Sequence, residues 1–216
     1  MSVLPASLIL LSSYTFNEMG TDVREETDIL RGVSMKRKTA KEMLAESFRE
    51  LAEKKPVDKI TVQDIIDNCG YSKTTFYRSF KDKYDLMAWN YIKRHKQIMD
   101  QTENDDYEWK KTLVDGAADF YEQKEYLKNL LMHTSGFDSF SQYMKQVHFD
   151  SLKRCVLKAS GLKNLDVKTE MYVRTYSQGT TDLTIDWIMG AYDVSPEELA
   201  EVYEDCLPVP LHKYLL

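Results

Sequence analysis

The hydrophobic positions of the 216-residue chain recur at the three- and four-residue spacing of amphipathic helices. In the first half of the chain this pattern predicts a helix over residues 39–53, two short helices within residues 61–83, and a longer helix from about 82 to 99. Beyond a polar break at residues 101–106, it predicts helices at about 107–123, 124–133, 137–160 and 167–191, and one from 195 to a tail at 207–210. Strand-like alternation, heptads and internal repeats do not emerge, so we predict an all-α fold.

The stretch from Thr61 to Lys83 has the local signals of a helix, a tight turn and a second helix. Thr61 followed by Asp64 forms a capping-box-like helix start. Gly70 can adopt the left-handed conformation that ends a helix, and Ser72 can cap the helix that follows. These signals predict a helix-turn-helix, in which the second helix is free to enter a DNA major groove.

The second of these helices separates apolar from polar side chains. Phe76 and Phe80 lie four residues apart, so both rings face the core. The remaining surface of the helix carries polar and hydroxyl-bearing side chains, namely Lys73, Thr74, Thr75, Tyr77 and Arg78. Such side chains can donate hydrogen bonds to phosphates and to base edges.

Residues 38–90 resemble the DNA-binding region of the tetracycline-repressor (TetR) family of transcriptional regulators. The resemblance is carried by a Gly-apolar-Ser turn, a Thr-apolar-Tyr signature, a Phe three residues on, and then Lys and Leu. In this chain these are Gly70, Tyr71, Ser72, Thr75, Phe76, Tyr77, Phe80, Lys83 and Leu86. Residues 179–207 are also loosely similar to the branch of the family linked to dihydroxyacetone kinase operons, in which a partner protein can carry the ligand signal.

We expect the chain to divide into three parts. Residues 1–34 are predicted to be a weakly ordered extension, as terminal segments often are. The resemblance implies a three-helix helix-turn-helix domain over 35–83 and a helical effector and dimerisation domain over 84–216. Met35 opens directly onto the basic residues 36–38, which makes it a plausible later translation start. The resemblance also implies a homodimer that binds double-stranded DNA at an inverted repeat.

The family pattern further implies a role for each polar residue of the motif. The positions that contact the phosphate backbone correspond to Thr75, Tyr77 and Lys83, and Thr61 is a further phosphate candidate. The positions that read bases correspond to Lys73 and Thr74, with Gln63 as a further base candidate. Arg78 and Lys38 are additional DNA-contact candidates, and the alternative for Lys38 is a solvated run of charge. The side chain of Thr61 can be used by the helix cap, which leaves its backbone N–H for a phosphate.

The distribution of charge agrees with a DNA-binding first half. The whole chain has a formal net charge of −6. Residues 35–96 hold 15 basic and 9 acidic residues, a net charge of +6, whereas residues 97–216 hold 12 basic and 21 acidic residues, a net charge of −9. The positive excess therefore lies on the segment with the helix-turn-helix, as a DNA footprint requires.

The remaining residue types do not indicate an enzyme. Three scattered cysteines without a CxxC pair favour a reducing cytoplasm over a disulfide framework. Four dispersed histidines lack the spacing of a metal site. The apolar run at residues 8–11 is too short to span a membrane. Nucleophile elbow, phosphate-loop and paired-carboxylate motifs do not stand out. We therefore expect no catalytic residue, no cofactor, no metal and no membrane partner.

Aromatic and methionine residues of the second half can line a ligand pocket, although ordinary core packing is the alternative. The pocket candidates are Trp109, Phe120, Tyr121, Phe137, Tyr143 and His148, with Tyr126, Met132, His133 and Met144 as further members. A dimer seam is predicted on the last two long helices, from Met171, Val173, Tyr176, Leu183, Trp187, Ile188, Leu199, Val202 and Tyr203.

Two functions remain open at this point. The first is a ligand-responsive homodimeric repressor that binds a small-molecule effector. The second is a DNA-anchored interaction module, or an activator, whose helical domain recruits a co-regulator protein. An enclosed cavity lined by aromatic residues favours the first, and a large exposed apolar patch without a cavity favours the second.

Overall fold

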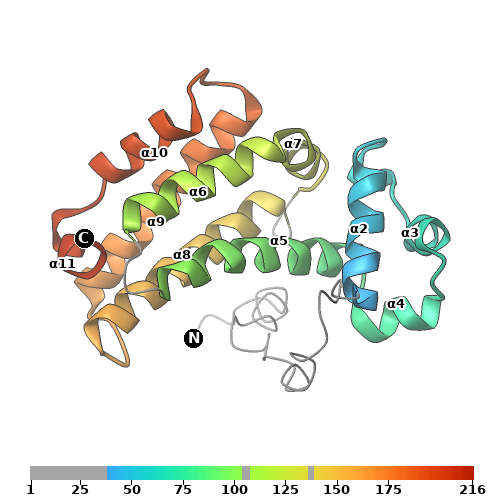
Figure 1. Cartoon of the computed structure of the whole chain (residues 1–216), viewed down its shortest axis with the longest axis horizontal. Coiled ribbons are helices and arrows are strands. Elements are labelled where there is room, and N and C mark those ends of the chain that lie inside the picture. The colour runs from blue at the N-terminus through green and yellow to red at the C-terminus, as the bar shows by residue number, and fades with distance from the viewer. Residues whose placement is uncertain (1–37, 104–107, 136–138) are drawn as a thin grey trace, which may run out of the picture. The chain divides into compact units, whose positions relative to one another are not determined.

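A computed structural model of the chain describes residues 38–103, 108–135 and 139–216, and these residues form helices without a strand (Figure 1). The first elements are α2 (Ala40–Ala52), the 3₁₀ turn η2 (Val57–Lys59), α3 (Val62–Cys69), α4 (Lys73–Ser79) and α5 (Lys83–Met99). They are followed by η3 (Asp100–Glu103), α6 (Trp109–Glu122), α7 (Lys124–Met132), α8 (Phe140–Ser160), α9 (Val167–Met189), α10 (Pro196–Asp205) and α11 (Val209–Leu215). The all-α prediction is confirmed.

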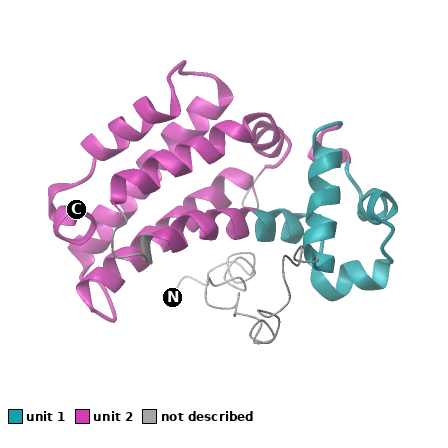
Figure 2. Ribbon diagram, viewed as in Figure 1, with its two compact units in different colours: residues 1–54, 60–90 teal, residues 55–59, 91–216 magenta. Residues whose placement is uncertain are grey.

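The chain forms two compact units (Figure 2). Of the described residues, the first unit contains 38–54 together with Ile60–Asn90, and the second contains Lys55–Lys59 together with those from Tyr91 to Leu216. The division lies within α5. The predicted extension over residues 1–34 falls outside the described residues, and the predicted domain boundaries stay predictions.

In the first unit, local chemistry fixes where each helix begins and ends. Thr39 and Thr61 both form complete capping boxes, at the starts of α2 and α3. Gly70 ends α3 with a φ of +73°, a left-handed conformation that would strain a side chain. Ser72 then caps α4 by accepting a hydrogen bond from the N–H of Thr75. The helix-turn-helix is therefore encoded by a few residues close together in sequence.

The core of the first unit contains a row of aromatic rings. Phe76 and Phe80 are buried with ring centroids 5.9 Å apart, and Phe80 packs edge-on against Trp89 at 5.7 Å. Leu44 and Phe48 of α2 are fully buried with them. Phe76 and Phe80 thus hold the inner face of α4, as predicted, and Trp89 is a core residue.

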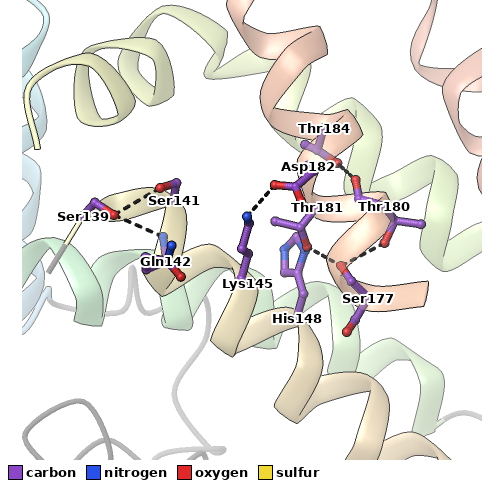
Figure 3. Close-up of polar contacts among 10 residues, drawn as sticks. All are labelled: Ser139, Ser141, Gln142, Lys145, His148, Ser177, Thr180, Thr181, Asp182 and Thr184. Atoms are coloured by element: carbon purple, nitrogen blue, oxygen red, sulfur yellow. Dashed lines mark hydrogen bonds and ion pairs between the residues drawn. The ribbon is translucent and has the colours of Figure 1, made fainter. Parts of the chain in front are cut away.

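The second unit is built from paired helices. Helix α8 packs along α9, and α6 packs along α10. At the α8–α9 contact, Lys145 forms a 2.6 Å ion pair with Asp182, and His148 is hydrogen-bonded to Thr181 (Figure 3). The cap glycine Gly190 ends α9 with a φ of +91°.

The prediction that residues 207–210 form a tail is wrong, because a further helix, α11, follows α10. Pro208 ends the preceding segment, but prolines at the first positions of a helix cost no hydrogen bond, so Pro210 lies within the first turn of α11. Leu211 is fully buried and Leu207 is 4 % exposed, both in a cluster with Leu152 and Val173. Burial of these leucines stabilises a short helix that has little support of its own.

The connection between α2 and α3 is hydrogen-bonded to α7, which explains why residues 55–59 group with the second unit. The Asn129 side chain accepts a 3.0 Å hydrogen bond from the N–H of Val57 and donates one of 3.0 Å to the carbonyl oxygen of Lys55. His133 Nδ1 also lies 3.5 Å from a carboxylate oxygen of Asp58. A single amide thus satisfies two backbone groups of the connection.

Candidate DNA interface and cavity

Helix α4 presents one buried face and one polar face. Phe76 is fully buried, whereas Lys73, Thr74 and Arg78 are exposed. Tyr77 is 58 % exposed, a high value for a large aromatic side chain, and its ring packs edge-on against Phe76 at 5.4 Å. The exposed residues of α4 are therefore available to a ligand as large as DNA.

Thr75 lies at the first turn of α4, beside its cap. Its backbone N–H donates to the Ser72 hydroxyl at 3.2 Å, and the hydroxyl groups of the two residues are 3.1 Å apart. The Thr75 side chain is half-buried. This geometry holds Thr75 close to the N-terminus of the helix, where backbone N–H groups favour an anion.

Thr61 is engaged by Asp64 through both its side chain and its backbone. The same Asp64 oxygen accepts from the Thr61 N–H at 2.7 Å and from the Thr61 hydroxyl at 2.8 Å. The backbone N–H that the sequence offers to a phosphate is thus already hydrogen-bonded. Among the predicted phosphate contacts, Thr61 is the one that DNA could reach only by displacing a carboxylate.

Two residues that are predicted to contact DNA, Gln63 and Lys38, are paired with other side chains of the protein. Gln63 donates to Asp67 at 2.7 Å along α3, and the Lys38 ammonium lies 2.6 Å from Glu46. The Lys38 and Glu46 side chains are 56 % and 43 % exposed. Exposed ion pairs contribute about 0–1 kcal/mol, so a phosphate can replace such a partner.

Lys83 begins α5 and links it to the start of the helix-turn-helix. Its ammonium donates to the carbonyl oxygen of Ile60 at 2.7 Å and lies 5.1 Å from the ring centre of Tyr84. An ammonium has three donors, so the bond to Ile60 orients the group without exhausting it. A structural role and a phosphate contact are compatible at this position.

The second unit encloses a cavity between α5, α6, α8, α9 and α10, with an empty volume of about 820 Å³ that includes the part open to solvent. Its wall is formed mainly by aromatic and aliphatic side chains. Pockets for small molecules in proteins are lined in this way.

The predicted pocket residues divide into three groups. Trp109, Phe120 and His148 line the cavity. Tyr121 is 57 % exposed and Tyr143 packs against Tyr91, and neither lines the cavity. Phe137 lies outside the described residues. Of the further members, Tyr126 and Met144 are buried elsewhere, and Met132 and His133 are not in the wall.

Sequence reasoning missed the contribution of α5 and α9 to the cavity. Tyr91 and His95 of α5, and Tyr176 of α9, line it. Tyr91 and His95 lie four residues apart on α5, and Tyr176 lies on a face of α9 that also holds core residues. Because core and cavity wall have the same helical spacing, periodicity alone cannot distinguish them. Polar residues on an otherwise apolar stripe, such as His95, were the only available signal.

A chain of hydrogen bonds in the cavity wall determines which nitrogen of His148 carries a proton. Thr181 donates its hydroxyl proton to the Ser177 carbonyl oxygen at 2.6 Å, so it accepts from His148 Nδ1–H at 2.8 Å (Figure 3). The Nε2 atom of the neutral ring then accepts from the Tyr91 hydroxyl at 2.8 Å. The network is complete with a neutral imidazole.

His95 stacks on His148, with ring centroids 4.9 Å apart and planes inclined by 23°. Its Nε2 atom lies 3.0 Å from the Ser151 hydroxyl. Burial lowers the pKa of His148 to about 4, and burial together with His148 and Arg154 lowers the pKa of His95 well below its usual value. Both rings are thus neutral at pH 7.

Two negative findings concern the residues that the structure describes. Among them, groups of three or more His, Cys, Asp or Glu side chains that could hold a metal ion are absent. In the same part of the chain, the helices are too short or too polar to cross a membrane.

The predicted dimer seam needs correction. Val173, Tyr176, Trp187, Ile188, Leu199 and Tyr203 are buried in the chain's own core and cannot form a seam. Met171 is 64 % exposed, Val202 is 45 % exposed and Leu183 is partly exposed. The sequence pattern could not distinguish the intrachain face of α9 and α10 from an intermolecular one.

A helix-turn-helix with exposed donors on its second helix, joined to a helical unit with an apolar cavity, defines the class of DNA-binding regulators. Comparison with family models agrees with this class. The model described as bacterial regulatory proteins of the tetR family matches residues 46–88, and the TetR model described as transcriptional regulator C-terminal region matches residues 107–207. The chain belongs to the TetR family, whose members are DNA-binding transcriptional regulators and not enzymes.

Solved structures with the same fold are distant in sequence. The "Dihydroxyacetone kinase operon activator DhaS" superposes with a TM-score of 0.61 at 15 % identity, over 82 % of this chain and 98 % of that one. A TetR regulator from Rhodococcus sp. RHA1 gives 0.59 at 16 %, over 80 % and 97 %, and one from Streptococcus agalactiae 2603V gives 0.54 at 18 %, over 78 % and 93 %. A comparison with curated protein sequences finds no match.

Proposed function

We propose that the protein is a cytoplasmic, homodimeric repressor that binds an inverted-repeat operator and releases it when a small molecule enters the cavity of the second unit. The observation that carries the ligand-responsive part is the cavity itself. Its wall is largely apolar and aromatic, as the walls of small-molecule pockets are. Such a cavity is expected of an effector site and has no use in a pure recruitment module.

Helix α5 supports a route for the ligand signal. It begins at Lys83, a predicted phosphate contact, and it contributes Tyr91, Arg94, His95, Ile98 and Met99 to the cavity wall. A ligand changes DNA affinity only if it prefers one conformation of the protein over another. Repositioning of α5 around a bound ligand gives the protein two such conformations.

At the DNA, phosphate contacts determine position and base contacts determine sequence. Lys73 and Thr74 are assigned to bases because they are exposed at the start of α4, and Gln63 joins them from α3. The phosphate contacts are Thr75, Tyr77 and Lys83, with Thr61 only where Asp64 gives way. Arg78 and Lys38 reach either the backbone or a base edge.

A dimer is required because one helix-turn-helix reads only one half-site. The exposed apolar residues Met171 and Val202 make α9 and α10 the preferred seam. Two copies related by a twofold axis would then present two recognition helices to half-sites one helical turn, or a multiple of it, apart.

The second candidate function is an activator that recruits a co-regulator protein. Several large apolar side chains of the second unit are exposed, including Val167 at 79 % and Val209 at 75 %. One similar structure is named an operon activator, so this fold is compatible with either sign of regulation. A promoter that carries the selected site and drives a reporter gene separates the two signs.

Selection of binding sites from random duplex DNA tests the proposal, with the purified protein as bait. We expect enrichment of one inverted repeat and a mass of two chains bound to it in sedimentation equilibrium. Enrichment of a single unrepeated half-site, or a monomer bound to the enriched DNA, would contradict the proposed dimer.

A further inference from the structure

The formal charges in the cavity wall cancel. Arg94 and Asp119 are the lining residues with a full charge, since His95 and His148 are neutral at pH 7. Arg94 donates to Asp119 through Nε at 3.0 Å and through Nη2, and the Gln123 amide donates to the other oxygen of Asp119. A charged ligand therefore meets a carboxylate and a guanidinium that already neutralise each other.

Most hydroxyl groups in the wall already donate a hydrogen bond to another group of the protein. Thr184 donates to the carbonyl oxygen of Thr180 at 2.8 Å, so the Tyr203 hydroxyl, 2.6 Å from Thr184, is the donor of that pair. Tyr176 donates to the Tyr203 carbonyl oxygen at 2.8 Å, and Thr180 donates to the Tyr176 carbonyl oxygen at 2.9 Å. These groups have little left to offer a ligand.

Thr112 is the exception. Its side chain is buried, with 5 % of the residue exposed, it lines the cavity, and its hydroxyl has no hydrogen-bond partner among the residues that the structure describes. One turn earlier on the same face of α6, Trp109 also lines the cavity. A buried polar group without a partner is destabilising by about 1–3 kcal/mol, so an acceptor supplied by a ligand would stabilise the Thr112 hydroxyl.

We propose that the cavity binds a neutral, mostly apolar molecule with one hydrogen-bond-accepting oxygen, a carbonyl or hydroxyl, which pairs with the hydroxyl of Thr112. The inference rests on the proposed ligand-responsive function and specifies the chemical class of its effector. The Thr112 hydroxyl can donate one hydrogen bond, so an acceptor on the ligand satisfies it. The remaining wall rewards apolar surface.

The same wall disfavours ions. Transfer of a carboxylate or an ammonium out of water is unfavourable unless an opposite charge is available to pair with it. The guanidinium of Arg94 and the carboxylate of Asp119 already form an ion pair with each other. The aromatic rings of the wall could instead bind a cationic ligand through cation–π contacts, so the experiment includes a cation.

Four probes of one shape test the class. They are 2-acetylnaphthalene, 2-ethylnaphthalene, the anion 2-naphthoate, and the cation N,N,N-trimethyl-2-naphthylammonium. Binding to the full-length protein is measured at pH 7.5 by isothermal titration calorimetry. We expect the acetyl compound to bind about fivefold more tightly than the ethyl compound, as one additional hydrogen bond predicts, and both ions to bind more weakly than either.

Two matched variants test whether the Thr112 hydroxyl causes the preference for the acetyl compound over the ethyl compound. Thr112→Val keeps the shape of the side chain and removes the unpaired hydroxyl, so it should fold and should bind the acetyl and ethyl compounds equally. Thr180→Val removes a hydroxyl of the same wall that is already bonded to backbone, and it should retain the fivefold preference. The difference between the two variants isolates the Thr112 hydroxyl.

The remaining outcomes overturn the proposal in distinguishable ways. Preference for the anion or the cation, or an unchanged acetyl preference in Thr112→Val, refutes the ligand class and leaves the regulator function standing. Failure of all four probes to bind saturably refutes the cavity as a ligand site, and with it the ligand-responsive part of the proposed function. DNA-site selection is independent of both results.

Discussion

In the first unit most of the polar side chains with predicted DNA roles lie on the surface, whereas in the second unit most polar side chains of the cavity wall are hydrogen-bonded within the protein. Lys73, Thr74 and Arg78 are exposed, and Lys38 holds only an exposed ion pair. In contrast, His148 is fixed by Tyr91 on one side and Thr181 on the other.

The difference shows how each unit can be altered by mutation. An exposed donor in water can exchange its partner for a phosphate at little free-energy change, so its removal affects binding and not folding. A buried network is costly to leave half-satisfied, so its disruption affects folding first. The predictions below test this contrast, from the largest expected effect to the smallest.

The largest effect is expected from Phe76, because it is a buried residue on the helix of the first unit that otherwise presents exposed side chains. Phe76→Ala should lower the free energy of unfolding by about 3–5 kcal/mol, because the ring is fully buried against Phe80. Urea unfolding followed by circular dichroism measures it. The control Arg78→Ala, on the exposed face of the same helix, should change stability by less than about 0.5 kcal/mol. Equal effects of the two variants would mean that α4 has no distinct inner face.

The second effect concerns the neutral histidines. The folded pKa of His148 is about 4 and the unfolded value is about 6.5, so between these values the unfolded chain binds more protons. The free energy of unfolding should therefore fall as pH falls from 6.5 towards 4, with a contribution of roughly 2 kcal/mol from His148 between pH 7 and 4.5.

His148→Gln supplies the comparison for this pH effect, because glutamine can donate and accept but does not titrate. Its unfolding free energy should depend less steeply on pH than that of the native chain, with His95 responsible for the slope that remains. Identical pH profiles for the two proteins would show that His148 is solvated and not part of a dry network.

The third effect is a loss of sequence preference. Lys73→Ala should relax the preference at one base position of the selected site by about 1–2 kcal/mol, because a side chain that reads a base edge is removed. Repetition of the selection with the variant measures it. Lys81→Ala, an exposed lysine just beyond α4, should alter affinity for all sequences alike. An unchanged motif with Lys73→Ala would remove that residue from the base contacts.

The smallest effect is expected from a single phosphate contact. Tyr77→Phe removes only a hydroxyl and should weaken binding to every sequence about fivefold, without a change in the salt dependence or in stability. Fluorescence anisotropy with the selected site and a scrambled one measures this. Tyr84→Phe, another exposed tyrosine, should bind as the native protein does. A loss of affinity confined to the selected site would make Tyr77 a base contact.

The sequence determined the first unit almost completely, because its signals are local. The cap at Thr61, the turn at Gly70 and the four-residue spacing of Phe76 and Phe80 each act within one or two helical turns. Exposure also follows from spacing on a short helix with one buried face. What spacing could not show is that Asp64 accepts from both hydrogen-bond donors of Thr61 and that Lys83 donates to the carbonyl oxygen of Ile60.

Only the tertiary structure decided the second unit beyond its helices. The pattern that marks a helix face as apolar is the same for a core, a cavity wall and a dimer seam, so Tyr176 was assigned to a seam although it lines the cavity. The same limit hid α11, whose burial of Leu211 depends on α8 and α9. The unpaired hydroxyl of Thr112 is likewise a property of its neighbours, because a hydrogen bond requires two groups that residues far apart in the sequence bring together.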